Sequence, residues 1–378
     1  MYDVIVIGAG PCGSTAAKEV TSYNLKTLLI DKKKHIGRPV HCTGLISKRT
    51  IETLKISQNS VLNEIKGAYI HFPNDKRITI ETQEVKAYVV DREAFDKELL
   101  HEAEKKGAEI QLETEAVNIA GNTLTIKHKG KESQLKTEVF IGAYGSRYSK
   151  NNSLANFPPP QKILYGLQTI AQYDSDNKNF VELFFGSNYS DCFFAWAVPM
   201  DKKRAKIGLA CSNAILAKKG LKNLLERLKC KDGQNPIAGI IPIGPAGITV
   251  KENMLICGDA AAHAKPTSGG GVYTGTLCAK IAAETAAKYI KGEGLLIEYE
   301  KRWRKEIGKE LKIGMFAHQI LTKLSDAQLN RIADIVLKPK TTALIKKWGD
   351  IDYPSSLIRK FFLHPQTTKT GRNSIPTP

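Results

Sequence analysis

A glycine-rich turn between two short apolar runs constrains this chain more than any other feature. Residues 2–7 (YDVIVI) are followed by GAGPCG at residues 8–13, and a second apolar run at residues 26–30 ends on Asp31. The two runs predict buried parallel strands, and the stretch between them predicts a helix that ends near Tyr23. This strand–turn–helix–strand unit is the arrangement that binds dinucleotides.

Each residue of the turn has a task in such a site. Gly8 allows the tight turn, Gly10 lets the backbone approach a pyrophosphate, and Gly13 allows the helix to pack closely on the strand. The start of the helix offers unpaired N–H groups and a positive dipole end to the phosphates. Cys12 is small enough for the turn to close, and Asp31 is placed to bind ribose hydroxyls. We therefore expect all five residues at the cofactor.

A second motif far along the chain favours FAD over NAD. Residues 254–257 predict another parallel strand, and Gly258 and Asp259 follow at its end. The segment resembles the GD motif of FAD-dependent aromatic hydroxylases, which implies that Asp259 contacts the ribityl chain of FAD; the competing interpretation is a helix cap. The glycine run before the next predicted helix places backbone N–H groups against the flavin ring, with Gly271 and Val272 as the expected contacts.

The same resemblance extends the expected FAD site to a third part of the chain. Arg92 opens a predicted helix that runs to Lys106. The resemblance implies that Arg92 lies against the FAD phosphates, which suits the fork of donors on a guanidinium; the alternative is an ordinary surface arginine. It also implies that the backbone of Ala116 and Val117 meets the adenine.

Two further segments resemble the geranylgeranyl reductase family, especially its archaeal branch that saturates digeranylgeranylglycerophospholipids. The first, RPVHCTGLIS at residues 38–47, implies that Cys42 and Thr43 lie beside the flavin. Cys42 is then a candidate catalytic residue, as a proton donor or a redox-sensitive group. A small buried packing residue is the other interpretation. Thr43 departs from the family pattern, which has glycine there.

The second segment is DCFFAWAVP at residues 191–199, which resembles the Y-x-W-x-F-P motif of the family. Phe194 replaces its tyrosine and Val198 its phenylalanine, so the segment stays apolar. Alternation predicts Phe194, Trp196 and Val198 on one face of a strand. Such a wall suits an isoprenoid chain, although the face of an ordinary sheet core has the same pattern.

These segments predict an α/β fold with a discontinuous FAD-binding Rossmann-type domain. We expect that domain to comprise residues 1–160 and 245–295, with an antiparallel-sheet substrate domain inserted at residues 161–244. A helical C-terminal region is expected at residues 296–363, followed by a loosely ordered polar tail at residues 364–378.

The net charge of +18 points to an acidic partner. No aromatic-basic module for nucleic acid is evident. An anionic membrane surface and an acidic electron carrier such as a ferredoxin are the two main interpretations, and a charge that serves general solubility is the other. NADPH is the other possible electron donor, but Tyr144 occupies the place of an aspartate that serves NADPH in the hydroxylases. The basic C-terminal helices, with Trp303, Phe316 and Trp348, are the expected membrane-docking surface.

Composition narrows the compartment and the chemistry. No apolar run is long enough to span a membrane, so we expect a cytoplasmic protein associated with the membrane from one side. Seven scattered cysteines have neither metal-ligand nor disulfide spacing, which favours a reducing environment and no metal.

The leading functional hypothesis is an FAD-dependent reductase that saturates C=C bonds of geranylgeranyl chains in archaeal-type membrane lipids or their precursors. One alternative is an FAD-dependent monooxygenase acting on an apolar or aromatic substrate. Another is a flavin-binding protein without catalysis, such as an electron-transfer partner. The tyrosine at position 144 argues against the monooxygenase.

Overall fold

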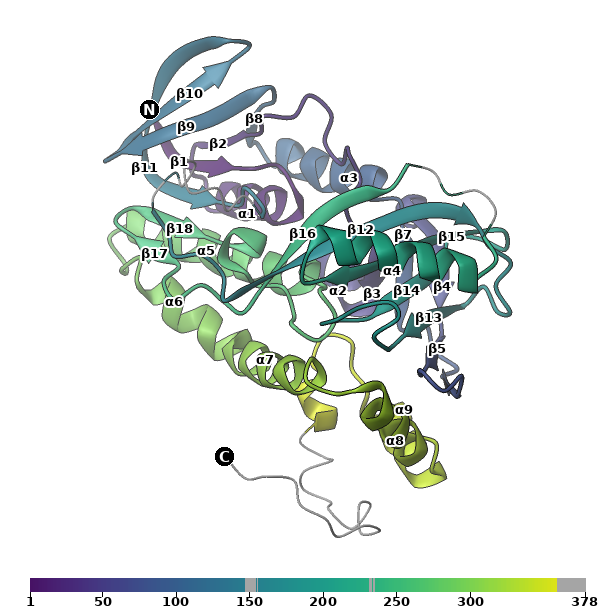
Figure 1. The fold of residues 1–378 in the computed structure, drawn as a ribbon. Helices are drawn as coiled ribbons and strands as arrows, with labels where there is room; N and C mark the ends of the chain where they lie inside the picture. The colour runs from purple at the N-terminus through teal and green to yellow at the C-terminus, as the bar shows by residue number, and fades with distance from the viewer. Residues whose placement is uncertain (147–153, 155, 231–232, 234, 359–378) are drawn as a thin grey trace.

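The computed structural model describes residues 1–146, 154, 156–230, 233 and 235–358 (Figure 1). The tail predicted at residues 364–378, and residues 359–363 of the expected helical region, lie outside this part of the chain.

The first sheet is the parallel sheet predicted from the apolar runs. Its strands follow the order β17-β18-β11-β1-β2-β8, and each neighbouring pair except β17–β18 is parallel. Two further strands, β9 and β10, extend β11 as an antiparallel ribbon. The bounds are β1 (Tyr2–Ile7), β2 (Thr27–Ile30), β8 (Glu109–Gln111), β9 (Thr114–Ala120), β10 (Thr123–His128), β11 (Lys131–Gly142), β17 (Val250–Lys251) and β18 (Met254–Ile256). The predicted Rossmann-type architecture is confirmed.

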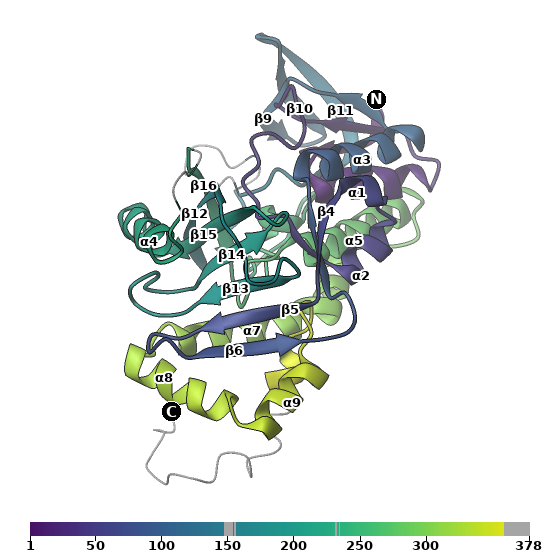
Figure 2. The same cartoon turned by 90° about the vertical axis from the view of Figure 1, so that its right-hand side faces the viewer.

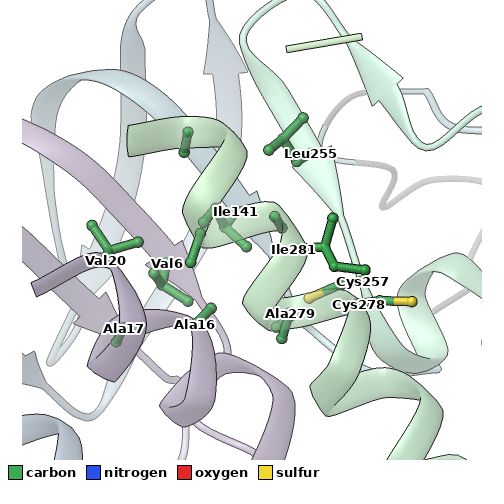
Figure 3. Packing of buried hydrophobic residues seen from close by; sticks show 14 of the residues in the cluster. Val6, Ala16, Ala17, Val20, Ile141, Leu255, Cys257, Cys278, Ala279 and Ile281 are labelled. Carbon is green, nitrogen blue, oxygen red and sulfur yellow. The ribbon is translucent and has the colours of Figure 1, made fainter. Parts of the chain in front are cut away.

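Three helices pack together against this sheet: α1 (Pro11–Thr21), α3 (Arg92–Lys105) and α5 (Val272–Ile290). Small residues let them approach closely, as Ala16 of α1 and Ala279 of α5 are completely buried beside Val6 of β1 (Figure 3). Asp91 caps α3 by accepting hydrogen bonds from two backbone N–H groups of the first turn. This core fixes where α1 and α5 begin, which is where the expected cofactor residues lie.

The second sheet is antiparallel apart from one parallel pair, β5–β13. Its order is β16-β12-β15-β14-β13-β5-β6. The bounds are β5 (Gly67–His71), β6 (Arg77–Glu81), β12 (Lys162–Gln172), β13 (Phe180–Phe184), β14 (Ala195–Pro199), β15 (Arg204–Cys211) and β16 (Ile237–Ile243). An amphipathic helix that was not predicted, α4 (Ala214–Arg227), covers one face.

The second sheet corrects the expected domain boundary. Residues 67–81 were predicted in the nucleotide-binding domain, yet they form β5 and the edge strand β6 at one end of the substrate sheet (Figure 2). The partner of β5 is β13, which lies more than a hundred residues later in the chain. A pairing of that separation leaves no local pattern in the sequence.

A small antiparallel sheet, β3-β7-β4, joins the two larger ones. It is formed by β3 (Leu45–Ser47), β4 (Val61–Ile65) and β7 (Ala87–Val90), with the helices α2 (Lys48–Leu54) and η1 (Gln58–Ser60) between its strands. Val89 and Ile65 pack with Val198 of the second sheet. The segment that carries Cys42 therefore runs into the junction between the two domains.

The C-terminal region is helical, as predicted. After the short η2 (Gly258–Ala261) and α5, it consists of α6 (Glu298–Trp303), the π-helical turn η3 (Arg304–Gly308), α7 (Lys309–Leu321), α8 (Asp326–Val336) and α9 (Pro339–Trp348). Helix α8 packs its Leu329 and Ala333 on Phe72 and Ile78, beside β5 and β6 (Figure 2). Among the described helices, none is both long enough and apolar enough to cross a membrane.

Trp303 does not belong to a docking surface, contrary to expectation. Its side chain is completely buried in the core of the first domain, and its indole N–H donates to Thr249 Oγ1 at 2.8 Å. Phe316 and Trp348 are exposed, with 54% and 37% of their surface accessible. The sequence did not separate these cases because all three aromatics lie in basic helical segments.

Candidate active site

The glycine turn has the geometry of a dinucleotide-binding loop. A Cβ on Gly13 would lie 1.7 Å from the carbonyl oxygen of Gly8, so only glycine fits between strand and helix. Gly8 itself has a φ of +104°, which favours glycine. A Cβ on Gly10, in contrast, would meet no protein atom within 4 Å. A pyrophosphate requires open space next to the N–H groups at the start of a helix, and Gly10 directly before α1 provides that space.

Two side chains predicted at the cofactor support the turn. Asp31 accepts a hydrogen bond from the Ala9 N–H at 2.8 Å through one carboxylate oxygen and one from Lys33 N–H at 2.8 Å through the other. Because each oxygen can accept twice, capacity for ribose hydroxyls remains. Cys12 packs where α1 meets the GD motif, and a Cβ on Gly258 would lie 2.6 Å from its sulfur. Burial raises the pKa of Cys12, so it is a neutral packing residue.

The GD motif meets the glycine run, Gly269–Gly271, at the end of residues 265–271, which we call the flavin loop. A Cβ on Gly271 would lie 3.1 Å from Asp259 Oδ1, and Gly271 directly precedes Val272, the first residue of α5. Burial raises the pKa of Asp259 to about 6, although the positive charge of Arg92 acts in the opposite direction. Asp259 therefore lies beside the start of α5, where the resemblance places the ribityl chain of FAD.

Arg92 lies between several of the predicted residues. It forms a two-pronged ion pair with Asp96, with both N···O distances 3.0 Å, and its guanidinium also interacts with the Cys42 side chain. Only 12% of the Arg92 side chain is exposed, which excludes an ordinary surface arginine. The Gly44 N–H lies 3.3 Å from the Cys42 sulfur, and Thr43 donates to Gln168 at 3.1 Å. These contacts tie the Cys42 segment to both domains.

Lys206 joins this group and was not predicted. It is 5% exposed, and its ammonium donates to the Val90 carbonyl at 3.4 Å. A Cβ on Gly44 would lie 3.0 Å from the ammonium nitrogen. Burial lowers the pKa of Lys206. Nothing local in the sequence marks this lysine, because it sits among other charged residues near a strand start.

Ala116 and Val117 lie apart from the residues above, on the antiparallel ribbon of the first sheet. Ala116 is half-buried against that sheet, and Val117 is 42% exposed. Both are in β9, whose preceding residue, Glu113, lies close to Asp31 through backbone hydrogen bonds at Lys33 and Thr114. The ribbon is thus beside the ribose end of the expected site.

The aromatic segment differs from the predicted strand face. Strand β14 begins only at Ala195, because Ser190 Oγ accepts hydrogen bonds from the N–H groups of Cys192 and Phe193 and holds the preceding residues in a turn. Trp196 and Val198 share a face as predicted, but Val198 is buried in the core between the domains. Phe194 stacks on Phe193 with ring centroids 4.2 Å apart.

Phe194 lines a cavity of about 130 Å³ that the sequence did not reveal. Much of its wall consists of apolar side chains from the turn before β14, from α7 and from the α7–α8 connection. Pro266 and Thr267 of the flavin loop complete it. Trp196 lies behind Phe194, with ring centroids 6.2 Å apart, and its buried indole N–H has no partner within the described part of the chain. An apolar cavity of about 150 Å³ accepts a benzene-sized group, so this one has room for an isoprenoid unit.

The arrangement fits a bound FAD at three independent points. Space is open at Gly10, glycines without side chains precede α1 and α5, and Asp259 faces the residue before α5. Helix starts present N–H groups to anions and to polar ring atoms. Metal-binding clusters of three or more histidine, cysteine or acidic residues are absent from the described residues.

Known proteins are similar to this chain over most of its length. A family model described as lycopene cyclase protein matches residues 3–337. A digeranylgeranylglycerophospholipid reductase of Methanocaldococcus jannaschii is 32% identical, with 88% of this chain and 90% of the relative covered. An uncharacterised protein of the same organism is also 32% identical, with 95% and 94% covered.

A solved structure has the same architecture throughout. A geranylgeranyl bacteriochlorophyll reductase-like protein of Thermoplasma acidophilum superimposes with a TM-score of 0.86 at 26% identity, covering 97% of this chain and 98% of that one. The chain is a member of the flavin-dependent geranylgeranyl reductase family of oxidoreductases.

Proposed function

We propose that this protein is an FAD-dependent reductase that saturates C=C bonds of geranylgeranyl chains, in archaeal-type membrane lipids or their precursors. The observation that carries the proposal is the aromatic cavity at Phe194, whose wall includes Pro266 and Thr267 of the predicted flavin loop. An isoprenoid chain offers only apolar surface and double bonds, and a cavity with Phe185, Phe193 and Phe194 in its wall, beside the flavin loop, matches that chemistry.

We assign the cofactor to the residues described above. The turn at Gly8, Gly10 and Gly13 holds the pyrophosphate, and Asp31 holds the ribose. Arg92, Asp259, Gly271 and Val272 hold the ribityl and ring portion, with Cys12 as packing and Ala116 and Val117 near the adenine. When bound, FAD supplies a hydride equivalent at its ring.

The chain's own groups position the alkene and exclude water. Phe193 and Phe194 confine an isoprenoid unit in the cavity, with Trp196 behind them, while Val198 supports the wall from the core. Cys42 lies beside Arg92 and Thr43 beside Gln168, outside the wall of this cavity. We propose Cys42 as a catalytic residue there, as a redox-sensitive group or a proton donor.

A direct test is single turnover with a chemical reductant. FAD-loaded protein reduced by dithionite is mixed with digeranylgeranylglycerophospholipid, and the product is analysed by mass spectrometry. Mass gains of hydrogen pairs are expected. A lipid that binds and keeps its mass contradicts the proposal, and an oxygen-dependent gain of one oxygen atom with NADPH indicates the monooxygenase instead.

We further propose peripheral contact with an anionic membrane through α7. The cavity wall includes Leu321, and exposed Phe316 and Ile320 lie one turn apart on the same helix. Exposed Lys312 and Lys323 flank them. Apolar side chains bordered by lysines suit the interface of an anionic bilayer, and the location lets a lipid tail enter the cavity without crossing water.

The electron donor is either an acidic carrier such as a ferredoxin or NADPH. The +18 charge suits an acidic carrier by long-range attraction. Anaerobic reduction of the bound FAD by each donor, followed by its absorbance, distinguishes them. A rate that falls steeply with salt is expected for the carrier.

A further inference from the structure

A histidine and a lysine form a buried pair at the cavity. His318, on α7, is 3% exposed and contributes to the cavity wall. Its Nε2 lies 3.2 Å from the ammonium nitrogen of Lys162, the first residue of β12. The pair therefore joins the C-terminal helices to the substrate sheet, beside the aromatic turn.

The contact fixes which ring nitrogen carries the proton. An ammonium group has donors and no acceptor, so Nε2 of His318 accepts and Nδ1 holds the hydrogen. Burial and the charge of Lys162 lower the pKa of His318 to about 4, so the ring is neutral near pH 7. The hydrogen bonds of the described residues include none from Nδ1. Because His318 contributes to the cavity wall, we assign this N–H to a guest in the cavity.

The position of the ring relative to the flavin loop suits a reaction at that loop. Phe193 separates the two, with its ring centroid 6.1 Å from that of His318 and its edge 3.7 Å from a Cβ built on Gly269. One turn before His318, a Cβ on Gly314 would lie 3.1 Å from Pro266. His318 and the loop residues Pro266 and Thr267 line the same cavity, so an alkene held there contacts both the histidine and the start of the flavin loop.

Lys162 connects the pair to solvent. Lys162 is partly exposed, whereas His318 is buried. A lysine in that position regains a proton from water after each turnover while the ring remains shielded from it. The pair has the arrangement of a proton relay from the surface into an apolar cavity.

We propose that His318 donates the proton of the alkene reduction and that Lys162 recharges it, an inference that rests on the proposed function. The π bond of the alkene breaks; one carbon gains a hydride, with its two electrons, from the reduced flavin, which is oxidised. The neighbouring carbon takes the Nδ1 proton as Nε2 takes one from the Lys162 ammonium. The resulting neutral amine is reprotonated by water.

Other titratable groups at the cavity are poorer donors. Asp191 and Asp326 already accept hydrogen bonds from the N–H groups of Ser212 and Ser187. Against the effect of burial, the hydrogen bonds from Ser212 lower the pKa of Asp191. Burial, with a smaller contribution from Asp191, raises the pKa of Cys192 to about 12. Cys42 is not part of the cavity wall. His318 is the group with both a free N–H and a proton source.

Single-turnover kinetics test the relay. Oxidation of the dithionite-reduced, FAD-loaded protein by the unsaturated lipid is followed for wild type, His318→Phe, Lys162→Met and Lys162→Arg. We expect His318→Phe and Lys162→Met to slow the reaction about 100-fold or more, the usual contribution of a general acid, with lipid affinity within threefold of wild type. Lys162→Arg keeps a charged N–H donor at this position, so its rate is expected to fall by less. His101→Phe and Lys127→Met, both at exposed positions on other elements, serve as matched controls.

Two readouts separate proton donation from a structural role. The solvent isotope effect in D2O is expected in wild type and lost in His318→Phe. In the cofactor-free protein, ¹⁵N NMR of His318 is expected to show the Nδ1–H tautomer, which Lys162→Met shifts toward Nε2–H.

The outcomes discriminate between the two proposals. A His318→Phe rate within threefold of wild type, a loss confined to lipid affinity, or an Nε2–H tautomer in wild type overturns the relay. Loss of turnover in Cys42→Ala while His318→Phe remains active moves the donor to Cys42. Wild-type protein that binds the lipid and never reduces it overturns the proposed function, and the relay with it.

Discussion

At the scale of single residues, the glycine turn separates folding from cofactor binding. Gly13 has no room for a Cβ, whereas Gly10 has room within the protein but faces the expected pyrophosphate. Its φ of −75° suits any residue. The two glycines of one motif therefore have different physical reasons to be glycine.

We predict opposite effects for alanine at these positions. Gly13→Ala should lower the free energy of unfolding of the cofactor-free protein by about 1–3 kcal/mol, the usual cost of overpacking. Gly10→Ala should leave that stability unchanged and weaken FAD binding about tenfold or more, or about 1.4 kcal/mol. Urea unfolding and FAD titration measure the two effects. Unchanged FAD affinity in Gly10→Ala would place the pyrophosphate elsewhere.

A second residue-scale feature is His263, which is completely buried against Trp303. Neither ring nitrogen has a hydrogen-bond partner in the described part of the chain. Burial, with a smaller effect of the Arg304 charge, lowers the pKa of His263 to about 3, against about 6.5 in an unfolded chain. The stability that the neutral ring contributes is therefore present above pH 6.5 and is lost as the pH falls toward 3.

The difference between the folded and unfolded pKa of His263 predicts how the free energy of unfolding depends on pH. Between pH 7.5 and pH 5, wild type should lose about 2 kcal/mol through this histidine, at about 1.4 kcal/mol per pH unit below pH 6.5. Urea unfolding of the cofactor-free His263→Leu variant should show a loss smaller by that amount. His101→Leu, at an exposed position, is the control. Equal losses in wild type and His263→Leu would refute the assignment.

At the scale of elements, the segment after α9 docks on the flavin loop. Lys265, in the loop, forms a buried ion pair with Asp352 at 2.8 Å and also donates to the Ile351 carbonyl at 2.8 Å. Arg49 pairs with Asp352 at 3.4 Å from the side of α2. The C-terminal segment thus fixes a loop that lies about ninety residues earlier.

Breaking this contact should loosen the loop. Asp352→Ala leaves Lys265 buried without its carboxylate, and removal of one partner of a buried pair costs about 3–5 kcal/mol. Lys265→Met should lower the free energy of unfolding by less, because Asp352 keeps its ion pair with Arg49. Urea unfolding gives the energies, and hydrogen exchange at residues 265–271 should accelerate in Asp352→Ala. Slow exchange there in the variant would show that the loop is held by other contacts.

Sequence patterns predicted those helices and strands whose bounds depend on residues close together in the chain. The strands at both ends of the first domain and the helices after Asp91 and Gly271 were predicted close to their observed bounds, because strand runs and helix boundaries are encoded over a few residues. The aromatic strand was predicted one residue too early, because the turn that displaces Phe194 depends on the Ser190 side chain. Helix α4 was missed although its apolar face is regular.

At the scale of the whole molecule, charge and exposed apolar groups predict a membrane response. Phe316→Ser and the double change Lys312→Glu/Lys323→Glu should each reduce flotation with phosphatidylglycerol vesicles severalfold, while phosphatidylcholine vesicles bind little. Salt at about 1 M should release the protein, since it shortens the screening length to about 3 Å. Ile215→Ser removes an exposed apolar group from α4 and should change nothing. Equal binding by the Phe316→Ser protein would exclude α7 as the contact.

The sequence by itself determined the parts of this protein whose chemistry is local: a dinucleotide turn, a strand-end aspartate, a glycine run before a helix, and a family signature at Cys42 and Phe194. Only the tertiary structure decided what brings them together. It placed β5 beside β13, buried Trp303, and set Val198 in a core and Phe194 in a cavity. It also joined His318 to Lys162 across 156 positions of the chain. Such contacts depend on the packing of whole elements, and no window of sequence contains both partners.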